Sequence, residues 1–267
     1  MPIAFSVDLE PNKDGTLGGV REAMEWFDEA VPRGTVFATY RIARELPELL
    51  ALLSENHEIG VHVHPVEFGG DCDQLAELSR SRQRRLIEQT RAAVADAIGV
   101  EPATVRSFRA GRHSASETTF DVLSKLGFAV DASVNVRYED YLPDRIRQVQ
   151  NAVFLGNGLV EVPTTYVVPK LLSRAGLNVF PHRNVTATAA TLRSDSMLDT
   201  GVTTLRAVFS DPSVELVSMY MHPYDATEYH EIENGGSTFR ERLESILATV
   251  DEFRTLGEVT PSSSDRL

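Results

Sequence analysis

Two short segments of the sequence carry paired side chains that could bind a metal or take up a proton. Asp8 and Glu10 lie two residues apart in Ser-Val-Asp-Leu-Glu, and His62 and His64 lie two apart in Val-His-Val-His. Side chains of an extended strand alternate between its faces, so each pair projects to one side. Adjacent carboxylates repel unless a cation or a shared proton separates them, and paired imidazoles suit zinc, iron, cobalt or nickel. The spacing indicates either one metal site with an acid beside it, or solvated acids and two surface histidines.

An arginine and a histidine later in the sequence could assist these acids in proton transfer. Arg109 stands in Ser-Phe-Arg-Ala-Gly, where a guanidinium can fork onto a carboxylate and keep it ionised. His222 stands in Met-Tyr-Met-His-Pro, and its ordinary pKa near neutrality suits donation of a proton to a leaving amine. The alternatives are a surface arginine on a loop and a core-edge histidine bound to the backbone. Arg112 and His113 follow Arg109 in a loop, where they could contact a substrate.

All of these side chains follow apolar runs that predict buried strands. Strands are expected at residues 3–7, 35–38, 58–63, 107–109, 129–132, 159–162 and 216–221. Helical periodicity predicts helices at residues 19–30, 41–54, 74–98, 116–126, 186–209 and 238–256. Such alternation is typical of a parallel sheet covered by helices, in which functional side chains gather at the carboxyl ends of the strands. The candidate residues are therefore expected at one end of one sheet.

The bulk properties are those of a single globular domain. A chain of 267 residues with 42% hydrophobic and 24% charged residues suits one barrel-type domain, predicted at residues 1–262 with a flexible tail at 263–267. No long apolar run predicts a membrane span, and the first residues lack the features of a signal peptide. Cys72 is the only cysteine, which excludes an internal disulfide and favours a reducing, cytoplasmic location.

The charge of the chain argues against a nucleic-acid partner. Acidic residues outnumber basic ones by 39 to 26, for a formal net charge of −13, whereas phosphate binding needs a basic face. The surplus of acid fits either adaptation to high salt or a GC-rich genome, and the sequence does not decide between them. It also leaves open whether the chain forms a homo-oligomer.

In chain order, these segments resemble the motifs of the polysaccharide deacetylase (NodB-homology) family, carbohydrate esterase family 4. The Asp8 segment resembles the first motif, His57-Glu58-Ile59-Gly60-Val61-His62 the second, the Arg109 segment the third and the His222 segment the fifth. Asp131 lies in the region of the fourth motif, whose tryptophan is missing. The resemblance covers nearly the whole chain and implies an α/β fold, a distorted (β/α) barrel with parallel strands and outer helices.

The sequence departs from the family pattern at two ligand positions. Leu9 stands where the first motif usually has its second aspartate, and Glu10 is the nearest acid on the correct strand face. Val66 stands where the second motif usually has its second histidine, which leaves His64 as the nearest substitute and Glu67 as a second candidate. These departures bear on which residues would hold a metal.

The resemblance implies metal-dependent hydrolysis of an amide C–N bond, above all the deacetylation of an N-acetylated sugar or glycan precursor. The implied ligands of a divalent metal, zinc or else cobalt, nickel or iron, are Glu10, His62 and His64. Two other interpretations stay open. One is a different linear or cyclic amide hydrolase, of the deformylase or allantoinase type, and the other is a non-catalytic carbohydrate-binding relative.

The resemblance also implies acid–base roles. Asp8 takes the proton of the attacking, metal-activated water, Arg109 keeps Asp8 ionised, and His222 protonates the departing amine. The expected partner is a small-molecule or glycan substrate that bears an N-acyl group. Without an export signal, a nucleotide-linked, lipid-linked or small soluble amino sugar fits better than an assembled wall polymer.

Overall fold

A computed structural model describes most of the chain. The described residues are 1–138, 140–147, 149–156, 158–167, 185–186, 192, 205–206, 208–209, 214–227, 235–262 and 267. None of the helices formed by these residues is long and apolar enough to span a membrane. The predicted C-terminal tail lies outside them, apart from Leu267, whose N–H donates to the carbonyl of Phe154.

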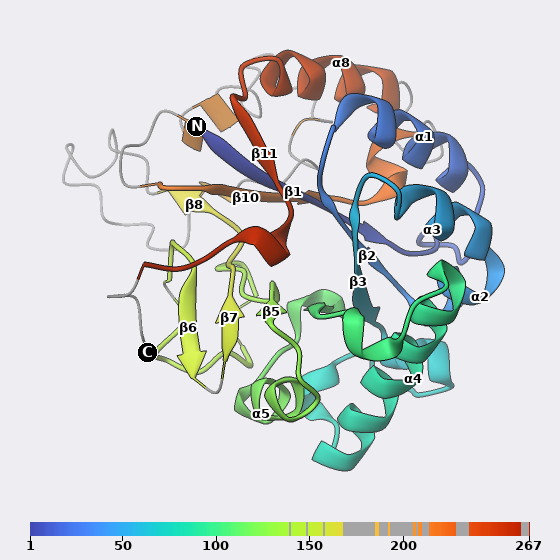
Figure 1. Ribbon diagram of the computed structural model, residues 1–267, viewed down its shortest axis with the longest axis vertical. Helices are drawn as coiled ribbons and strands as arrows, with labels where there is room; N and C mark the ends of the chain where they lie inside the picture. Colours follow the sequence, from blue (N-terminus) through green and yellow to red (C-terminus); the bar gives the residue numbers. More distant parts are fainter. Residues whose placement is uncertain are drawn as a thin grey trace.

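One curled sheet forms the centre of the molecule (Figure 1). Its strands, in spatial order, are β10 (Val217–Met221), β1 (Pro2–Leu9), β2 (Thr35–Ala38), β3 (Glu58–Val63), β4 (Ser107–Ala110), β5 (Val130–Asp131), β7 (Leu159–Glu161) and β6 (Val153–Gly156). All neighbours in this series are parallel except β7 and β6. β11 (Glu252–Arg254) pairs in parallel with the first residues of β1. β8 (Tyr166–Val167) and β9 (Val185–Thr186) form a separate antiparallel pair.

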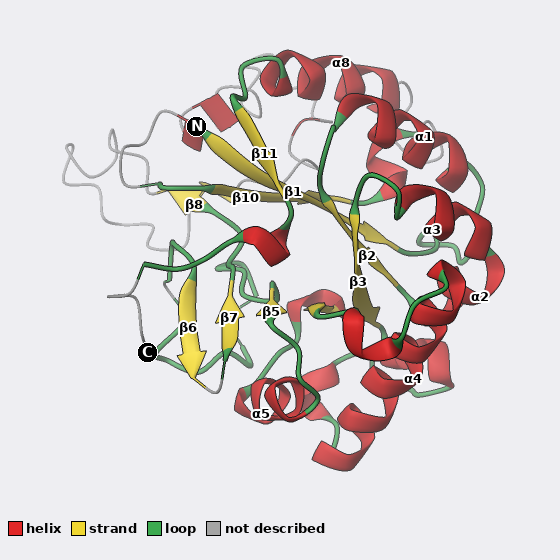
Figure 2. Ribbon diagram, in the orientation of Figure 1, coloured by secondary structure: helices red, strands yellow, loops and turns green. Residues whose placement is uncertain are grey.

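The helices surround this sheet in an arc (Figure 2). They are α1 (Val20–Ala30), α2 (Tyr40–Glu45), α3 (Pro47–Leu53), α4 (Arg80–Ile98), α5 (Glu117–Lys125) and α8 (Gly235–Leu247). Short 3₁₀ turns, η1 (Pro65–Phe68), η4 (Gly111–His113) and η6 (Pro223–Ala226), follow the ends of β3, β4 and β10. Parallel strands with outer helices confirm the predicted fold class, a distorted (β/α) barrel.

Two predicted helices differ from the structure. The helix expected at residues 41–54 is broken at Leu46, because Pro47 lacks an N–H and disfavours helical backbone in the residue before it. The helix expected at residues 238–256 ends at Leu247, and Glu252–Arg254 form β11 instead. Local periodicity could not reveal β11, because its partner strand is at the opposite end of the chain.

The remaining predicted elements differ mainly at their ends. The helix expected at residues 74–98 begins as a 3₁₀ turn, η2 (Leu75–Glu77), and α4 starts only at Arg80. The helix expected at residues 186–209 lies almost wholly outside the described residues, and Thr186 itself belongs to β9. All seven predicted strands are present, which places the site predictions on the intended elements.

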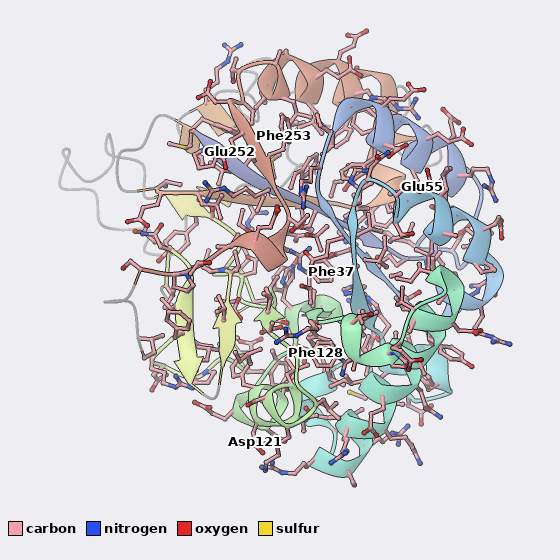
Figure 3. All side chains as sticks on the ribbon, viewed as in Figure 1. Phe37, Glu55, Asp121, Phe128, Glu252 and Phe253 are labelled. Atoms are coloured by element: carbon pink, nitrogen blue, oxygen red, sulfur yellow. The ribbon has the colours of Figure 1, made fainter. Side chains whose placement is uncertain are left out.

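The register of the parallel strands brings the candidate residues to neighbouring levels of the sheet, with Asp8 two residues from the level of His62 and Arg109. Asp8 of β1 is the partner of Phe37 in β2, and His62 of β3 is the partner of Arg109 in β4. Phe37, labelled in the middle of Figure 3, is fully buried. Gly60 makes room for its ring, because a Cβ at Gly60 would lie 2.6 Å from Phe37. The Arg109 guanidinium packs 4.5 Å from the centroid of that ring, so the inner face of the sheet supports it.

Candidate active site

A cleft of about 1320 Å³ opens at the carboxyl ends of the strands. It is lined by five of the six predicted site residues: Asp8, Glu10, His62, His64 and His222. The sixth, Arg109, is 1% exposed and lies behind Asp8. The strand ends of a parallel sheet therefore meet here as the sequence predicted.

Glu10, His62 and His64 form what we call the acceptor cluster. Glu10 Oε2 lies 2.8 Å from His64 Nε2 and 3.5 Å from His62 Nε2, and the two Nε2 atoms are 3.2 Å apart. His62 Nδ1 lies 2.9 Å from the Arg109 carbonyl oxygen, and His64 Nδ1 lies 2.9 Å from Asp73 Oδ2. A carbonyl or a carboxylate only accepts, so each Nδ1 carries a hydrogen, and a ring that gives up its Nε2 proton presents a lone pair there to the cluster.

Three acceptor atoms that converge in this way fit a divalent cation. Lone pairs at these separations repel one another, and a cation between them turns the repulsion into coordination. Burial raises the pKa of Glu10, but hydrogen bonds from His62 and His64 hold it well below its usual range. Burial lowers the pKa of His64, yet hydrogen bonds to Asp73 and Glu10 raise it to about 10, so a cation that binds here would displace the Nε2 proton of this ring. Within the described part of the chain, no other three His, Cys, Asp or Glu residues converge as a candidate metal site.

Asp8 and Arg109 form a buried ion pair behind the cluster. Arg109 Nη1 donates to Asp8 Oδ1 at 2.6 Å, and Arg109 Nε donates to the carbonyl of Ala132 at 2.9 Å. The guanidinium lies between the rings of Phe37 and Tyr220, 4.5 Å and 5.1 Å from their centroids. Burial raises the pKa of Asp8, but the charge of Arg109 and nearby histidines outweighs burial and lowers it below its ordinary value. Asp8 is therefore ionised.

His222 faces the same acids from the end of β10. Its Nε2 lies 4.0 Å from Asp8 Oδ2 and 3.8 Å from Glu10 Oε1. Asp225 Oδ2 accepts the backbone N–H of His222 at 2.8 Å and lies 3.4 Å from its Nδ1. The Tyr224 ring stacks on the imidazole, with centroids 4.7 Å apart. Burial lowers the pKa of His222, but the hydrogen bond to Asp225 and the charge of Glu10 raise it to about 9, so the imidazole is protonated at neutral pH.

Two residues of the site were missed by the sequence analysis, Asp73 and Asp225. Asp73 lies nine residues beyond His64 in a loop, and no motif marks it. Asp225 lies three residues after His222, and that short spacing between an acid and a candidate acid–base histidine was a usable signal. Glu67, the second candidate ligand, lines the cleft but accepts the backbone N–H of Arg41 at 3.0 Å and stands outside the acceptor cluster.

The loop after β4 turns sharply beside the cluster. Arg112 and His113 have φ values of 53° and 54°, a left-handed conformation that few residues other than glycine adopt. Both line the cleft, as expected for residues near a substrate. His113 is held by the Ser133 carbonyl, 3.1 Å from its Nδ1. Burial, together with the charge of Arg109, lowers the pKa of His113 to about 3, so its ring is neutral.

A second pair of acids, Asp131 and Glu161, is sealed inside the sheet and does not line the cleft. The two are register partners in β5 and β7, and both are 0% exposed. Ser133 Oγ donates to Asp131 Oδ1 at 2.6 Å, and the Val134 N–H donates to Glu161 Oε1 at 3.0 Å. Asp131 Oδ2 and Glu161 Oε2 are buried without a hydrogen-bond partner among the described residues, and burial raises the pKa of both carboxyl groups, so we expect the pair to retain a proton. Asp131 therefore belongs to the interior rather than to the reacting groups.

Residues 13–130 match the family model described as polysaccharide deacetylase. Curated protein sequences offer no significant match. The match confirms, for this part of the chain, the resemblance inferred from its motifs.

Solved structures resemble this chain over nearly its whole length. A candidate polysaccharide deacetylase from Mycobacterium smegmatis is 18% identical, with a TM-score of 0.60 over 94% of this chain and 85% of that one. A family 4 acetyl xylan esterase from Clostridium thermocellum, in complex with a cobalt ion, is 12% identical, with a TM-score of 0.55 over 97% and 89%. A peptidoglycan N-acetylglucosamine deacetylase is 14% identical, with a TM-score of 0.54 over 96% and 86%. At these identities the likeness is one of fold.

Proposed function

Because residues 13–130 of this chain match the polysaccharide deacetylase family, we propose that the protein is a hydrolase that removes the acetyl group from an N-acetylated sugar or glycan precursor. The observation that carries the proposal is the convergence in one cleft of Asp8, His222 and the acceptor cluster. Amide hydrolysis needs a base for water, an acid for the departing nitrogen and positive charge near the carbonyl oxygen. The cleft offers a candidate for each requirement.

Glu10, His62 and His64 would hold a divalent metal, with zinc as the first choice and cobalt, nickel or iron as alternatives. Two imidazole nitrogens and one carboxylate oxygen form a ligand set that catalytic zinc sites use, with a further position left open. When bound, such an ion lowers the pKa of water and polarises the amide carbonyl. The Glu10 side chain is 16% exposed, so the cluster is reachable from the cleft.

Asp8 is the proposed general base. Arg109 occupies its Oδ1, which leaves Oδ2 as the oxygen that can take the proton of the attacking water. Arg109 keeps this carboxylate ionised and oriented, and its own position is set by the bond from Nε to the Ala132 carbonyl. Arginine is suited to this role because its planar guanidinium holds both contacts at once.

His222 is the proposed general acid. Its Nε2 faces the carboxylates of Asp8 and Glu10 across the cleft, and Asp225 holds the ring from the opposite side. A protonated imidazole there can deliver its Nε2 proton to the nitrogen that leaves with the sugar. The products are acetate and a free amine.

The first test combines metal content with acetate release. We expect protein purified without chelators to carry about one metal ion per chain, and to release acetate from N-acetylglucosamine oligomers or nucleotide-linked N-acetyl sugars. A chelator should abolish the release and added zinc should restore it. His222→Ala should lower kcat by about 10²–10⁴-fold, since the leaving nitrogen loses its proton donor.

Asp96→Asn is a control, because Asp96 is an exposed residue of α4 and does not line the cleft. Its kcat should equal that of the wild type. Protein that carries no metal and whose acetate release survives His222→Ala would contradict the proposal.

A further inference from the structure

The position of His64 depends on two residues outside the acceptor cluster. His64 directly follows β3. It is the histidine that substitutes for the usual second histidine of the second family motif, whose position is taken here by Val66. Gly111 is the first of the two residues, because a Cβ there would lie 2.7 Å from both His64 Cε1 and the Val63 carbonyl oxygen. Real Cβ atoms do not approach other atoms so closely, so the ring can occupy this place only beside a glycine.

Asp73 is the second residue. It lies in the loop between η1 and η2, and its Oδ2 is 2.9 Å from His64 Nδ1 and 2.7 Å from Arg112 Nε. Its side chain is 14% exposed, in line with a carboxylate enclosed by these partners. A carboxylate has no hydrogen to donate, so Asp73 Oδ2 faces His64 Nδ1 as an acceptor.

We propose that Asp73 is a positioning residue for a divalent metal at the acceptor cluster, and that Arg112 holds Asp73 in place. The inference rests on the proposed function, because it requires that His64 bind a metal. A carboxylate that accepts the Nδ1 hydrogen selects the tautomer whose Nε2 lone pair faces the cluster, and it holds the plane of the ring. The same contact raises the basicity of Nε2 and so strengthens its bond to a cation.

The two histidines of the cluster differ in how this support is supplied. His62 receives it from the backbone carbonyl of Arg109, at 2.9 Å, which no side-chain substitution removes directly. His64 receives it from a side chain on a separate loop, so a single substitution can withdraw it. The Asp73–Arg112 contact is more exposed, since the Arg112 side chain is 61% accessible, and we expect it to contribute less than the contact with His64.

The test measures zinc affinity directly. Metal-free protein is titrated with zinc in competition with a chromophoric chelator, and the cobalt-loaded protein is compared by visible absorption. Asp73→Ala should weaken zinc binding by about 10–100-fold and alter the cobalt spectrum. Asp73→Asn should lose less, because its amide oxygen can still accept the Nδ1 hydrogen, and Arg112→Gln should lose least. Asp71→Ala, an exposed acid of the same loop, is the matched control and should bind zinc like the wild type.

Thermal unfolding of the metal-free variants separates positioning from loop support. If Asp73 only stabilised its loop, the melting temperature would fall while the folded variants bound zinc as the wild type does, and the inference would be overturned. Asp73→Asn keeps the size of the side chain and gives the measurement if Asp73→Ala does not fold. Wild-type protein that binds neither zinc nor cobalt would overturn the proposed function together with the inference. Tight wild-type binding with unchanged affinity in both Asp73 variants would overturn the inference alone.

Discussion

The acids at the end of β1 and the acids of β5 and β7 are both largely withdrawn from water, yet their pKa values shift in opposite directions. Burial raises the pKa of Asp8 and of Glu10, but Arg109 and nearby histidines outweigh burial at Asp8, and hydrogen bonds from His62 and His64 outweigh it at Glu10. Burial also raises the pKa of Asp131 and Glu161, and there it prevails, assisted in Glu161 by the charge of Asp131. We therefore expect one pair to be ionised and the other to retain a proton.

The difference lies in the positive partner that each pair can reach. The β1 acids open on a cleft and meet a guanidinium and imidazoles, which stabilise carboxylates. The acids of β5 and β7 have neutral hydrogen-bond donors, the Ser133 hydroxyl and the Val134 N–H, so we expect the pair to retain a proton. Burial alone therefore does not distinguish the proposed catalytic acid from the sealed pair. The marker is a buried acid kept ionised on an open cleft.

The largest expected difference between the two pairs is in catalysis. Asp8→Asn should lower kcat by about 10²–10⁴-fold, because an amide cannot take the proton of the attacking water. Glu161→Gln, a matched acid-to-amide change in the sealed pair, should leave kcat unchanged. Steady-state acetate release by both variants, with folding checked by circular dichroism, tests the contrast. Similar losses in both would show that the two pairs do not differ in the way proposed.

A second contrast concerns the partner of Asp8. Arg109→Met should lower the free energy of unfolding by about 3–5 kcal/mol, because it leaves the Asp8 carboxylate buried without its ion-pair partner. Urea denaturation at neutral pH measures the loss. Adding Asp8→Asn to Arg109→Met removes the buried unpaired charge. The double variant should therefore recover part of the free energy of unfolding that Arg109→Met loses. A loss below about 1 kcal/mol in the single variant would mean that the guanidinium is not what keeps Asp8 ionised.

The smallest expected effect is on the pH dependence of stability, which should differ in sign between the two pairs of acids. The pKa of Glu161 is raised well above 4.5 by burial, so its contribution to stability is complete below that value and is lost as pH rises through the folded-state pKa. Asp8 and Glu10 behave in the opposite sense, because their lowered pKa values add stability above the unfolded-state values that is lost as pH falls. Glu161→Gln supplies an N–H donor in place of the retained proton and should flatten the alkaline decline.

Between pH 5 and pH 8, the free energy of unfolding of Glu161→Gln should gain about 1 kcal/mol relative to the wild type. Urea denaturation at several pH values measures this difference. Parallel pH profiles for the two proteins would argue that Asp131 and Glu161 retain no proton.

Much of the candidate site could be predicted because its members stand at strand ends. Alternation along an extended strand puts Asp8 with Glu10, and His62 with His64, whatever surrounds them, and parallel pairing carries these ends to one edge. His64 lies one residue beyond β3 but keeps extended backbone, with φ −106° and ψ 110°, so the alternation continues through it. Asp73 could not be predicted in this way, because the path of its loop depends on the elements that it packs against.

The sequence by itself determined most of the strands and helices and placed the side chains at the strand ends in the cleft, because helical and strand periodicity act over a few residues. Our prediction missed the helix break at Pro47 and the strand β11. Only the tertiary structure decided the partners and the pKa shifts: Asp73 beside His64, Asp225 beside His222, and the raised pKa values of Asp131 and Glu161. The physical reason is that pKa values and hydrogen bonds depend on burial and on distances through space, which local pattern does not specify.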